Sequence, residues 1–207
     1  MSSSNSSAEA DTNHKLGVKS FRSGDLNQAM QHWQIAASLG HVGAVHDLGV
    51  LAYETENFEM ARKFWLRAAD KGFVAAMYHL AMMADEEGDS VEFKKWSKAA
   101  ADAGDSKAMY NLGVTAEEEG NKKEAKDWYL RAADAGHASA MHNLGVHAYD
   151  AGQKSEAKNW YLRAAELGDT DAMINLGLMA HDEGDLDAER MWMKRARPQS
   201  KGYEIRD

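Results

Sequence analysis

The stretch WYLRAADAGHASAMHNLG at residues 128–145 returns as WYLRAAELGDTDAMINLG at residues 160–177, 32 positions later. An earlier copy, FWLRAADKGFVAAMYHLA, lies at residues 64–81, and looser copies begin at Trp96 and His32. A fixed period of about 20–50 residues is the signature of repeat architectures, in which each unit buries its apolar face against its neighbours. The sequence therefore predicts one array of stacked units.

Three sets of landmarks keep this spacing along the chain. One glycine set comprises Gly40, Gly72, Gly104, Gly136 and Gly168, and a leucine set comprises Leu16, Leu48, Leu80, Leu112, Leu144 and Leu176. A second glycine set comprises Gly24, Gly88, Gly120, Gly152 and Gly184, with Glu56 in the remaining slot. No insertion breaks the period, so no separate domain is expected between units.

The expected organisation is a single repeat domain over residues 8–199. Its six units are predicted at about residues 8–39, 40–71, 72–103, 104–135, 136–167 and 168–199. Residues 1–7 are rich in Ser and Asn and are predicted to form a disordered tail, and residues 200–207 a short C-terminal tail.

Each unit is predicted to fold as two helices. Small and apolar residues recur at helical spacing in both halves, as at Ala108, Leu112 and Ala116 and then at Ala125 and Tyr129. The glycines suit the left-handed turn after a helix, a conformation expected of Asn57 in the second unit. Predicted N-caps are Asp25, Asn57, Asp89, Asn121 and Asp185, with Gln153 weaker, and predicted capping boxes use Glu92, Glu124 and Glu156.

A further recurring glycine lies inside the first helix of most units. Gly49, Gly113, Gly145 and Gly177 occupy this position, and Ala81 takes it in the third unit. Glycine within a helix costs about 1 kcal/mol relative to Ala, so its recurrence needs a compensating reason. We expect close contact between the two helices of a unit, with the bulky aromatic residue of the second helix filling the adjacent space.

Composition narrows the class of protein and of partner. The net charge of -9 makes nucleic-acid phosphates and anionic lipid surfaces poor partners. The N-terminus lacks the features of a secretory signal, and no segment approaches the ~20 apolar residues of a membrane span, so a cytoplasmic protein is expected. There are no cysteines, which excludes disulfides and thiolate metal sites.

The segment RAADAGHASAMHNLG at residues 131–145, with its AAxxGxxxAxxNLG frame, resembles the Sel-one-like repeat, a relative of the tetratricopeptide repeat. The turn inside each unit, such as EEGNKKEA at residues 118–125, is shorter than in that family and is similar to the tetratricopeptide pattern. The resemblance implies an all-α, right-handed α-solenoid of about six helix-turn-helix repeats. It also implies a concave face lined by first helices, and an adaptor or scaffold rather than an enzyme.

Positions on the first helices that repeat packing leaves free to vary are the candidates for partner binding. Tyr supplies apolar area with a polar tip, and Asn can hold a peptide backbone. The candidates are His46, Asp47, Tyr53, Tyr78, Asp85, Tyr110, Asn111, Glu117, His142, Asn143, Tyr149, Asn175 and His181. The open alternative is that these aromatic residues pack between adjacent first helices and that the Asn residues only satisfy local backbone. A protein or peptide with basic or aromatic character fits the acidic chain.

Two other functions are considered. The last helix carries Met191, Trp192 and Met193 with no following repeat to cover them, so a self-assembling structural spacer with homo-oligomers formed through this C-terminal edge is the alternative. A metal-dependent enzyme would use some of the nine histidines, but their spacings, five residues for His142 and His147, do not converge on one helix face. No P-loop, GxSxG or GxGxxG motif occurs, and no cofactor or metal is expected.

Overall fold

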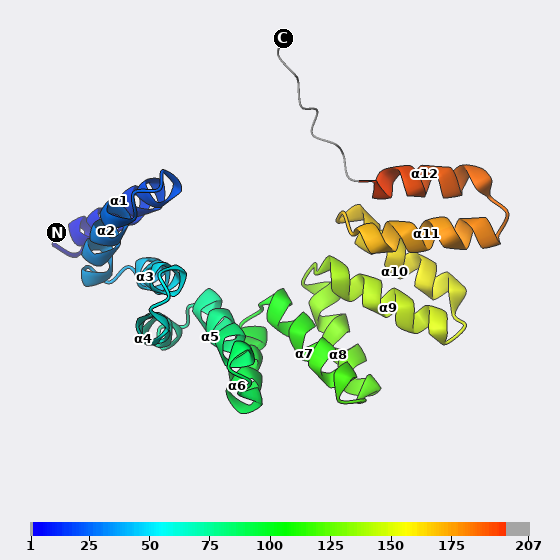
Figure 1. The fold of residues 1–207 in the computed structure, drawn as a ribbon, viewed down its shortest axis with the longest axis horizontal. Helices are drawn as coiled ribbons and strands as arrows, with labels where there is room; N and C mark the ends of the chain where they lie inside the picture. Colours follow the sequence, from blue (N-terminus) through cyan, green and yellow to red (C-terminus); the bar gives the residue numbers. More distant parts are fainter. Residues whose placement is uncertain (1, 198–207) are drawn as a thin grey trace, which may run out of the picture. The chain divides into compact units, whose positions relative to one another are not determined.

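The computed structural model describes residues 2–197, with side chains from Ser6 onward, and this part of the chain contains helices and no strand (Figure 1). The helices are α1 (Ser2–Arg22), α2 (Leu26–Ser38), α3 (Val42–Glu54), α4 (Phe58–Ala69), α5 (Val74–Glu86), α6 (Ser90–Asp102), α7 (Ser106–Glu118), α8 (Lys122–Asp134), α9 (Ala138–Asp150), α10 (Lys154–Glu166), α11 (Thr170–Asp182) and α12 (Leu186–Ala196). Each 32-residue repeat forms one helical hairpin, so the all-α repeat fold expected from the sequence is confirmed.

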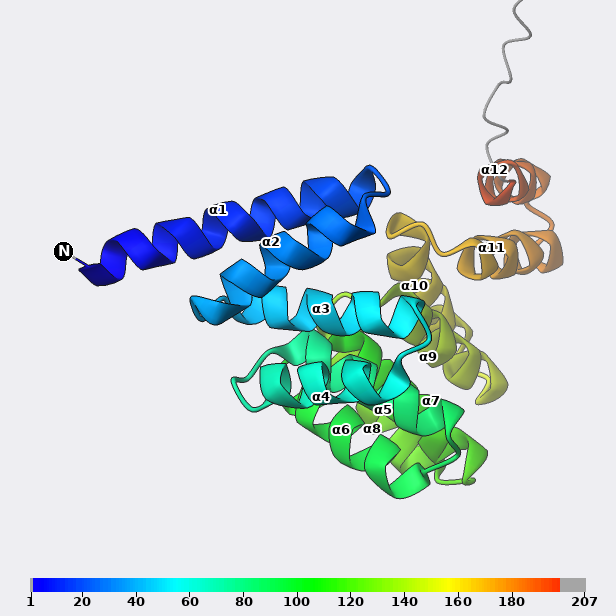
Figure 2. The same cartoon turned by 60° about the vertical axis from the view of Figure 1, so that its left-hand side comes forward.

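The chain divides into two compact units, Met1–Ala108 and Met109–Asp207. The first unit contains α1 to α6, and its longest helix, α1, lies against α2 in both views (Figures 1 and 2). The second unit contains most of α7 and all of α8 to α12. The prediction of a single domain over residues 8–199 stays a prediction, and the predicted tail at residues 200–207 lies outside the described residues.

Alanine forms the close contacts of both units. Ala29, Ala61, Ala125 and Ala157 on the even-numbered helices are fully buried. The landmark leucines of α5, α9 and α11 are also buried, with 0–2% of their surface exposed. Small side chains let two helices approach closely, and burial of Leu is worth about 1.5–3 kcal/mol per side chain. The repeat therefore specifies the hairpin mainly through its Ala and Leu positions.

At the glycines inside the odd-numbered helices, an aromatic ring of the following even-numbered helix packs directly against the backbone. A Cβ added at Gly49 would lie 2.5 Å from Trp65, and one added at Gly145 would lie 2.4 Å from Tyr161. The close contact predicted at these glycines is therefore confirmed. In the third repeat both partners change together, because Ala81 faces the position of Ser97, and both are 1% exposed.

The last repeat keeps the same contact with a different side chain. Met193 stands at the position of Tyr161, 32 residues further along, and its Cε would lie 2.9 Å from a Cβ added at Gly177. Met193 therefore packs against α11 and is half-buried. Met191 is 47% exposed, and α12 has no buried residue.

The helix ends follow the predicted N-caps but not the predicted capping boxes. The side chains of Asp25, Asn57, Asp89, Asn121 and Asp185 each accept a backbone N–H of their helix, whereas Gln153 makes no such bond. The boxes at Glu92 and Glu124 are wrong, since the N–H groups of Asp89 and Asn121 donate to the preceding helix. These two glutamates instead accept from the indole Nε1 of a tryptophan four residues later, Trp96 and Trp128 respectively.

Two other local predictions are wrong. Glu56, not Asn57, takes the left-handed conformation after α3, with φ of 60°, because Asn57 is needed with φ of -91° as the N-cap of α4. Residues 2–7, predicted to be disordered, form the first turns of α1. Ser costs only about 0.5 kcal/mol relative to Ala in a helix, and extending a formed helix is much easier than starting one.

Candidate peptide-binding grooves

Three hydrogen bonds between successive odd-numbered helices join residues 33 apart rather than 32. His14 Nε2 lies 2.8 Å from the Asp47 carboxylate, and the Tyr53 hydroxyl donates to Glu86 at 2.5 Å. In the second unit the Nδ2 of Asn175 lies 2.9 Å from His142 Nε2. These three bonds are therefore offset by one position from the repeat period. This offset decides which of the predicted residues meet.

A groove of about 440 Å³ lies between α3 and α5 in the first unit, here called the α3–α5 groove. Tyr53 and Tyr78 belong to its walls, and Trp65 and His79 stack with ring centroids 4.8 Å apart and an angle of 13° between their planes. Its remaining lining residues are Val50, Glu54, Met82, Met83 and Glu86. The groove combines aromatic and methionine surface with two carboxylates.

The electrostatics of the α3–α5 groove favour a cation. The pKa of Tyr53 is raised, first by its hydrogen bond to Glu86, so the hydroxyl stays protonated and keeps donating to that carboxylate. Burial and the nearby His46 and Lys107 lower the pKa of His79 to about 4, so its ring is neutral at pH 7. Lys107 Nζ lies 5.8 Å from the centre of the Tyr78 ring, which places a cation on this aromatic face.

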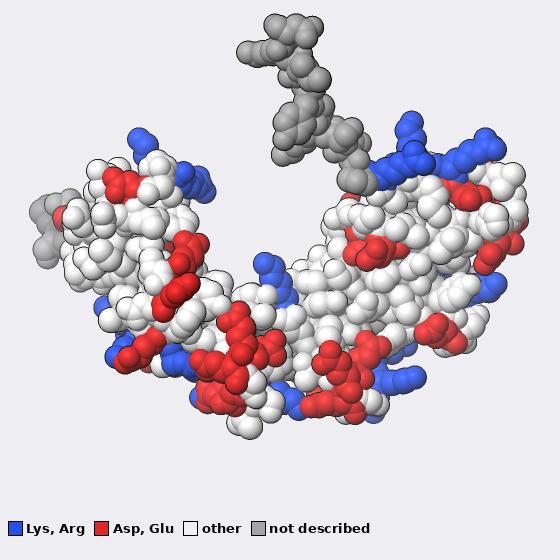
Figure 3. All heavy atoms as spheres, viewed as in Figure 1, with Lys and Arg blue, Asp and Glu red and all other residues white. Residues whose placement is uncertain are grey.

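Acidic side chains occur regularly at one end of the odd-numbered helices. The final residue of each odd-numbered helix from α3 to α11 is acidic: Glu54, Glu86, Glu118, Asp150 and Asp182. Acids at a helix C-terminus oppose the macrodipole by about 0.3–1 kcal/mol each, so packing and helix stability do not require them. Figure 3 shows acidic side chains gathered over α5 and α6 in the first unit.

The second unit repeats the α3–α5 groove three repeats later. A hollow of about 120 Å³ is lined by Tyr149, Tyr161, Asn175, Leu178 and Met179, and is here called the α9–α11 groove. These residues stand 96 positions after Tyr53, Trp65, His79, Met82 and Met83. Tyr149 is 39% exposed and Leu178 is 52% exposed, so the apolar wall is accessible.

Between α7 and α9 the corresponding position is closed by a polar network. Glu117 accepts from the Tyr129 hydroxyl at 2.7 Å, and its other oxygen lies 2.6 Å from His147 Nε2. Although burial opposes it, these two hydrogen bonds lower the pKa of Glu117. Burial, with the bond to Glu117, raises the pKa of Tyr129. Glu117, a predicted binding residue, is therefore engaged within the second unit.

Several other predicted residues also contact neighbouring helices. His46 and Asp47 bond to each other at 2.9 Å, and Asp47 has a lowered pKa because its bonds to His46 and His14 outweigh the effect of burial. Tyr110 stacks on His137 with centroids 4.6 Å apart. His142 lies 3.3 Å from the Asn143 amide oxygen as well as contacting Asn175.

The remaining predicted residues are Asp85, Asn111 and His181. Asp85 is exposed next to Glu86, and Asn111 is half-buried. His181 lies 3.1 Å from the Glu189 carboxylate, a bond that raises the pKa of the histidine. Within residues 2–197, no three His, Asp or Glu side chains are grouped so as to hold a metal ion. None of the helices described here is long and apolar enough to cross a membrane.

Sequence reasoning missed the carboxylates of the α3–α5 groove. Glu54 and Glu86 follow the landmark leucine by six positions, where an acidic residue recurs every 32 residues from Glu54 to Asp182. That recurrence is visible in the sequence, but a run of acids at a helix end is usually solvated. The 33-residue offset that pairs Tyr53 with Glu86 becomes visible only when the hairpins are stacked.

Two families of helical repeats match the sequence. The Sel1 (Sel-one) repeat matches residues 15–41, 43–73 and 106–137, and the tetratricopeptide repeat matches residues 142–204. A search of curated proteins found no match.

Solved structures are similar over most of the chain. A Sel1 repeat protein from Oxalobacter formigenes is 24% identical over 91% of this chain and 87% of its own, with a TM-score of 0.76. The antigen c5321, a protective antigen of uropathogenic Escherichia coli strains with an SLR fold, is 23% identical over 90% of this chain, with a TM-score of 0.72. The present chain spans 45% of c5321. The pilF protein of Pseudomonas aeruginosa is 16% identical over 95% of both chains, with a TM-score of 0.68. These similarities show a shared fold.

Proposed function

Because this chain is a Sel1-like, tetratricopeptide-like repeat protein, and such repeats are generally protein-interaction scaffolds, we propose that it is an adaptor. It holds a partner peptide in the grooves between its odd-numbered helices. The peptide carries a Lys or Arg side chain that enters the α3–α5 groove, with aromatic or aliphatic residues beside it. The adaptor performs no chemistry itself.

The observation that carries this proposal is the composition of the α3–α5 groove. Two carboxylates, Glu54 and Glu86, line the same hollow as the rings of Tyr53 and Tyr78. A cation held over an aromatic face gains about 0.5–2 kcal/mol, and a carboxylate partner adds a charge-assisted hydrogen bond.

The acids at the ends of the odd-numbered helices support the same kind of partner. Each costs its helix a little stability, and the cost recurs in five consecutive repeats. Complementary charge steers a partner toward a surface and suppresses partners of the wrong sign. A basic segment would meet the same sign of charge along each unit.

Affinity capture from the native source, followed by mass spectrometry, tests the proposal with a charge-reversed groove. Glu86→Lys places a cation inside the α3–α5 groove and should abolish capture of a partner that wild-type protein retains. Asp127→Lys reverses an exposed acid on α8 that lines neither groove and serves as the matched control, with capture unchanged. Equal capture by the Glu86→Lys protein would reject the α3–α5 groove as the binding site, provided that both variants keep the wild-type helical content.

Self-association through α12 remains the alternative function. Leu186 and Met191 are 51% and 47% exposed, and no residue of α12 is buried. Arg190, Lys194 and Arg195 on this helix are exposed, and Figure 3 shows basic side chains gathered over its part of the surface. Sedimentation velocity on the purified protein separates the two functions, because the adaptor needs no second copy.

A further inference from the structure

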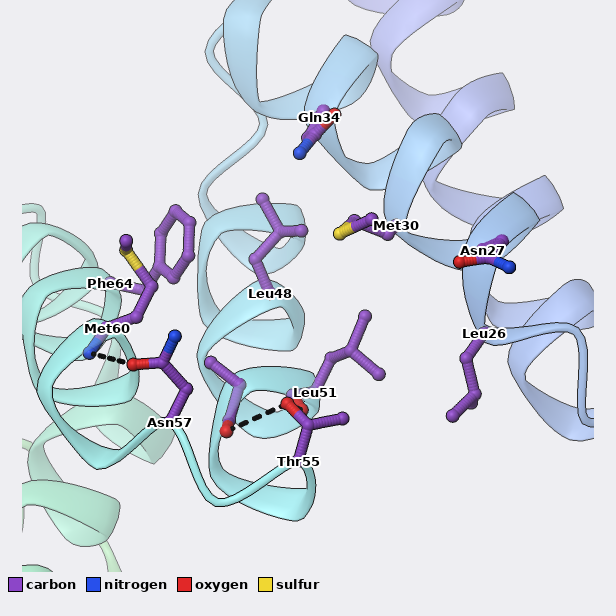
Figure 4. Close-up of a pocket in the computed structure, with 11 residues that line it drawn as sticks. Leu26, Asn27, Met30, Gln34, Leu48, Leu51, Thr55, Asn57, Met60 and Phe64 are labelled. Carbon is purple, nitrogen blue, oxygen red and sulfur yellow. Dashed lines mark hydrogen bonds between the residues drawn. The ribbon is translucent and has the colours of Figure 1, made fainter.

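A second groove, between α2 and α4 in the first unit, is apolar at a place where other repeats are charged. This α2–α4 groove has a volume of about 340 Å³ and is walled by Leu26, Met30, Met60 and Phe64 over a floor of Leu48 and Leu51 (Figure 4). None of its lining residues is charged; its polar members are Asn27, Gln34, Thr55 and Asn57. It shares no lining residue with the α3–α5 groove.

The other repeats show that packing does not require apolar side chains here. The position of Met30 is basic in all five later repeats, as Arg62, Lys94, Lys126, Lys158 and Arg190. Two of these basic residues form ion pairs with the acid that follows the next odd-numbered helix, Arg62 with Glu87 and Lys158 with Glu183, the latter at 2.9 Å. Thr55 stands at the position of Glu87 and Glu183.

At the first junction, Met30 and Thr55 thus replace an ion pair. The change exposes apolar surface instead of covering it, since Leu26, Met30 and Met60 are each about 40% exposed. Exposed apolar side chains gathered over a groove are typical of a binding surface. In Figure 4, Met30 points from α2 across the groove toward the α3 side.

The geometry of the walls points to a helix as the occupant. Leu26, Met30 and Gln34 are four residues apart along α2, and Met60 and Phe64 are four apart along α4. Rows of side chains at this spacing form the ridges between which another helix packs. The row on α2 spans about 12 Å, the length of roughly two helical turns.

Charge at one end of the groove favours a basic residue on the partner. Asp25, Glu56 and Glu59 are the sequence neighbours of the lining residues Leu26, Asn57 and Met60, respectively, and Lys63 pairs with Glu59 at 2.6 Å. These acids outnumber the base at this end. The partial positive charges of the α2 and α4 N-termini are met by the side chains of Asp25 and Asn57.

We propose that the α2–α4 groove binds one amphipathic helix of a partner protein, with large apolar side chains at i, i+4 and i+7 or i+8 and a Lys or Arg at the end that faces Glu56. The helix lies between α2 and α4 and contacts the floor formed by α3. This site is independent of the peptide proposed for the α3–α5 groove.

The test is a peptide-display selection that uses the repeat's own ion pair as the counter-selection. A library of random peptides of about 16 residues, long enough for four helical turns, is selected on wild-type protein. Peptides that also bind Met30→Arg/Thr55→Glu are removed. This variant carries the pair that occurs at Arg62 and Glu87, so it should keep the fold. The expected enriched sequences carry the apolar spacing and the terminal basic residue.

An enriched peptide is then synthesised with a fluorophore and titrated by anisotropy. Its affinity should fall at least about tenfold, a change of about 1.4 kcal/mol, in Met30→Arg/Thr55→Glu and stay unchanged in Glu86→Lys. Equal binding to the first variant, or enriched peptides without the helical spacing, overturns the proposal. A last outcome would also overturn the proposal: no peptide binds in a way that depends on Met30, but binding of the detergent dodecyl maltoside is lost in Met30→Arg/Thr55→Glu. The groove would then hold an alkyl chain.

Discussion

At the scale of single residues, Glu56 holds a conformation that glycine holds in the other repeats. Its φ is 60°, whereas Gly24, Gly88, Gly120, Gly152 and Gly184 have φ of 73–82° at the equivalent turn. A residue with a Cβ pays roughly 1–2 kcal/mol for this left-handed region. Part of that cost is offset by the lower entropy of a Glu in the unfolded chain.

Glu56→Gly is therefore expected to stabilise the protein by about 0.5–1 kcal/mol. Gly88→Glu is the reciprocal control, because nothing lies within 4 Å of the position where its Cβ would stand. Only backbone strain is then added, so this variant should lose a similar amount. Urea unfolding of both variants measures the effect. A loss of stability in Glu56→Gly would contradict the inference that the backbone is strained at Glu56.

His79 links stability to pH, since its pKa of about 4 in the folded chain lies below the ordinary value of 6.5. The unfolded chain then binds a proton that the folded chain does not. The contribution of His79 is complete above pH 6.5 and is lost as the pH falls from 6.5 toward 4. Asn111, Asn143 and Asn175 occupy the equivalent position in later repeats, so His79→Asn is a substitution that the fold accepts.

Between pH about 7.5 and about 5, wild-type protein should lose about 1 kcal/mol more than His79→Asn, after a discount for solvent screening of this partly exposed ring. The free energy of unfolding in urea, measured at both pH values, is the readout. Equal pH dependence in the two proteins would show that His79 is not buried as a neutral ring. The other histidines are common to both proteins and cancel in the comparison.

At the scale of helices, the hairpin depends on matched sizes across its interface. Gly145 faces Tyr161, and Ala81 faces the position of Ser97, so a larger residue on one helix accompanies a smaller one on the other. Gly145→Ala alone should cost about 1–3 kcal/mol through overpacking, even though Ala favours helix. Tyr161→Ser alone should cost about 3–5 kcal/mol through the cavity it leaves.

The double variant Gly145→Ala/Tyr161→Ser reproduces the third repeat and should be more stable than the sum of the two single losses. A coupling energy of about 0.5–3 kcal/mol in the favourable direction is expected from a double-mutant cycle. Chemical unfolding of wild-type protein, the two single variants and the double variant measures this coupling energy. Strict additivity would mean that Ala81 and Ser97 are tolerated for unrelated reasons.

The sequence predicts the hairpins because every unit packs by the same rule. Leu144, Gly145 and Tyr161 recur at fixed spacing, and local helix signals agree with that period. The predicted capping boxes fail for a physical reason. The turn is so short that the N–H of Asn121 already donates to a carbonyl oxygen of α7. Glu124 therefore accepts from Trp128 instead of from that N–H.

The grooves were only partly predictable. Tyr53, Tyr78 and Tyr149 were expected on the binding face and do line grooves, but Glu117 and His142 are engaged by neighbouring helices. The rotation between successive hairpins sets the 33-residue offset, and the repeat period does not contain that information. The α2–α4 groove arises because Met30 and Thr55 depart from the other repeats, which becomes meaningful only beside the ion pair of Arg62 with Glu87.

At the scale of the molecule, the first unit carries two grooves of different chemistry. The α3–α5 groove carries carboxylates and aromatic rings, and the α2–α4 groove carries methionine and leucine. Each is tested by a variant that leaves the other intact, Glu86→Lys and Met30→Arg/Thr55→Glu. One partner could use both surfaces, and linked sites strengthen binding without any new contact.

Methionine methyl NMR tests the central claim most directly, because methionines line both grooves. Met82 and Met83 belong to the α3–α5 groove, and Met30 and Met60 belong to the α2–α4 groove. A basic peptide taken from the captured partner is titrated into protein labelled at its methionine methyl groups. Saturable shifts are expected at Met82 and Met83, and they should disappear in Glu86→Lys. Shifts confined to methionines outside the α3–α5 groove, or shifts that persist in Glu86→Lys, would contradict the central claim.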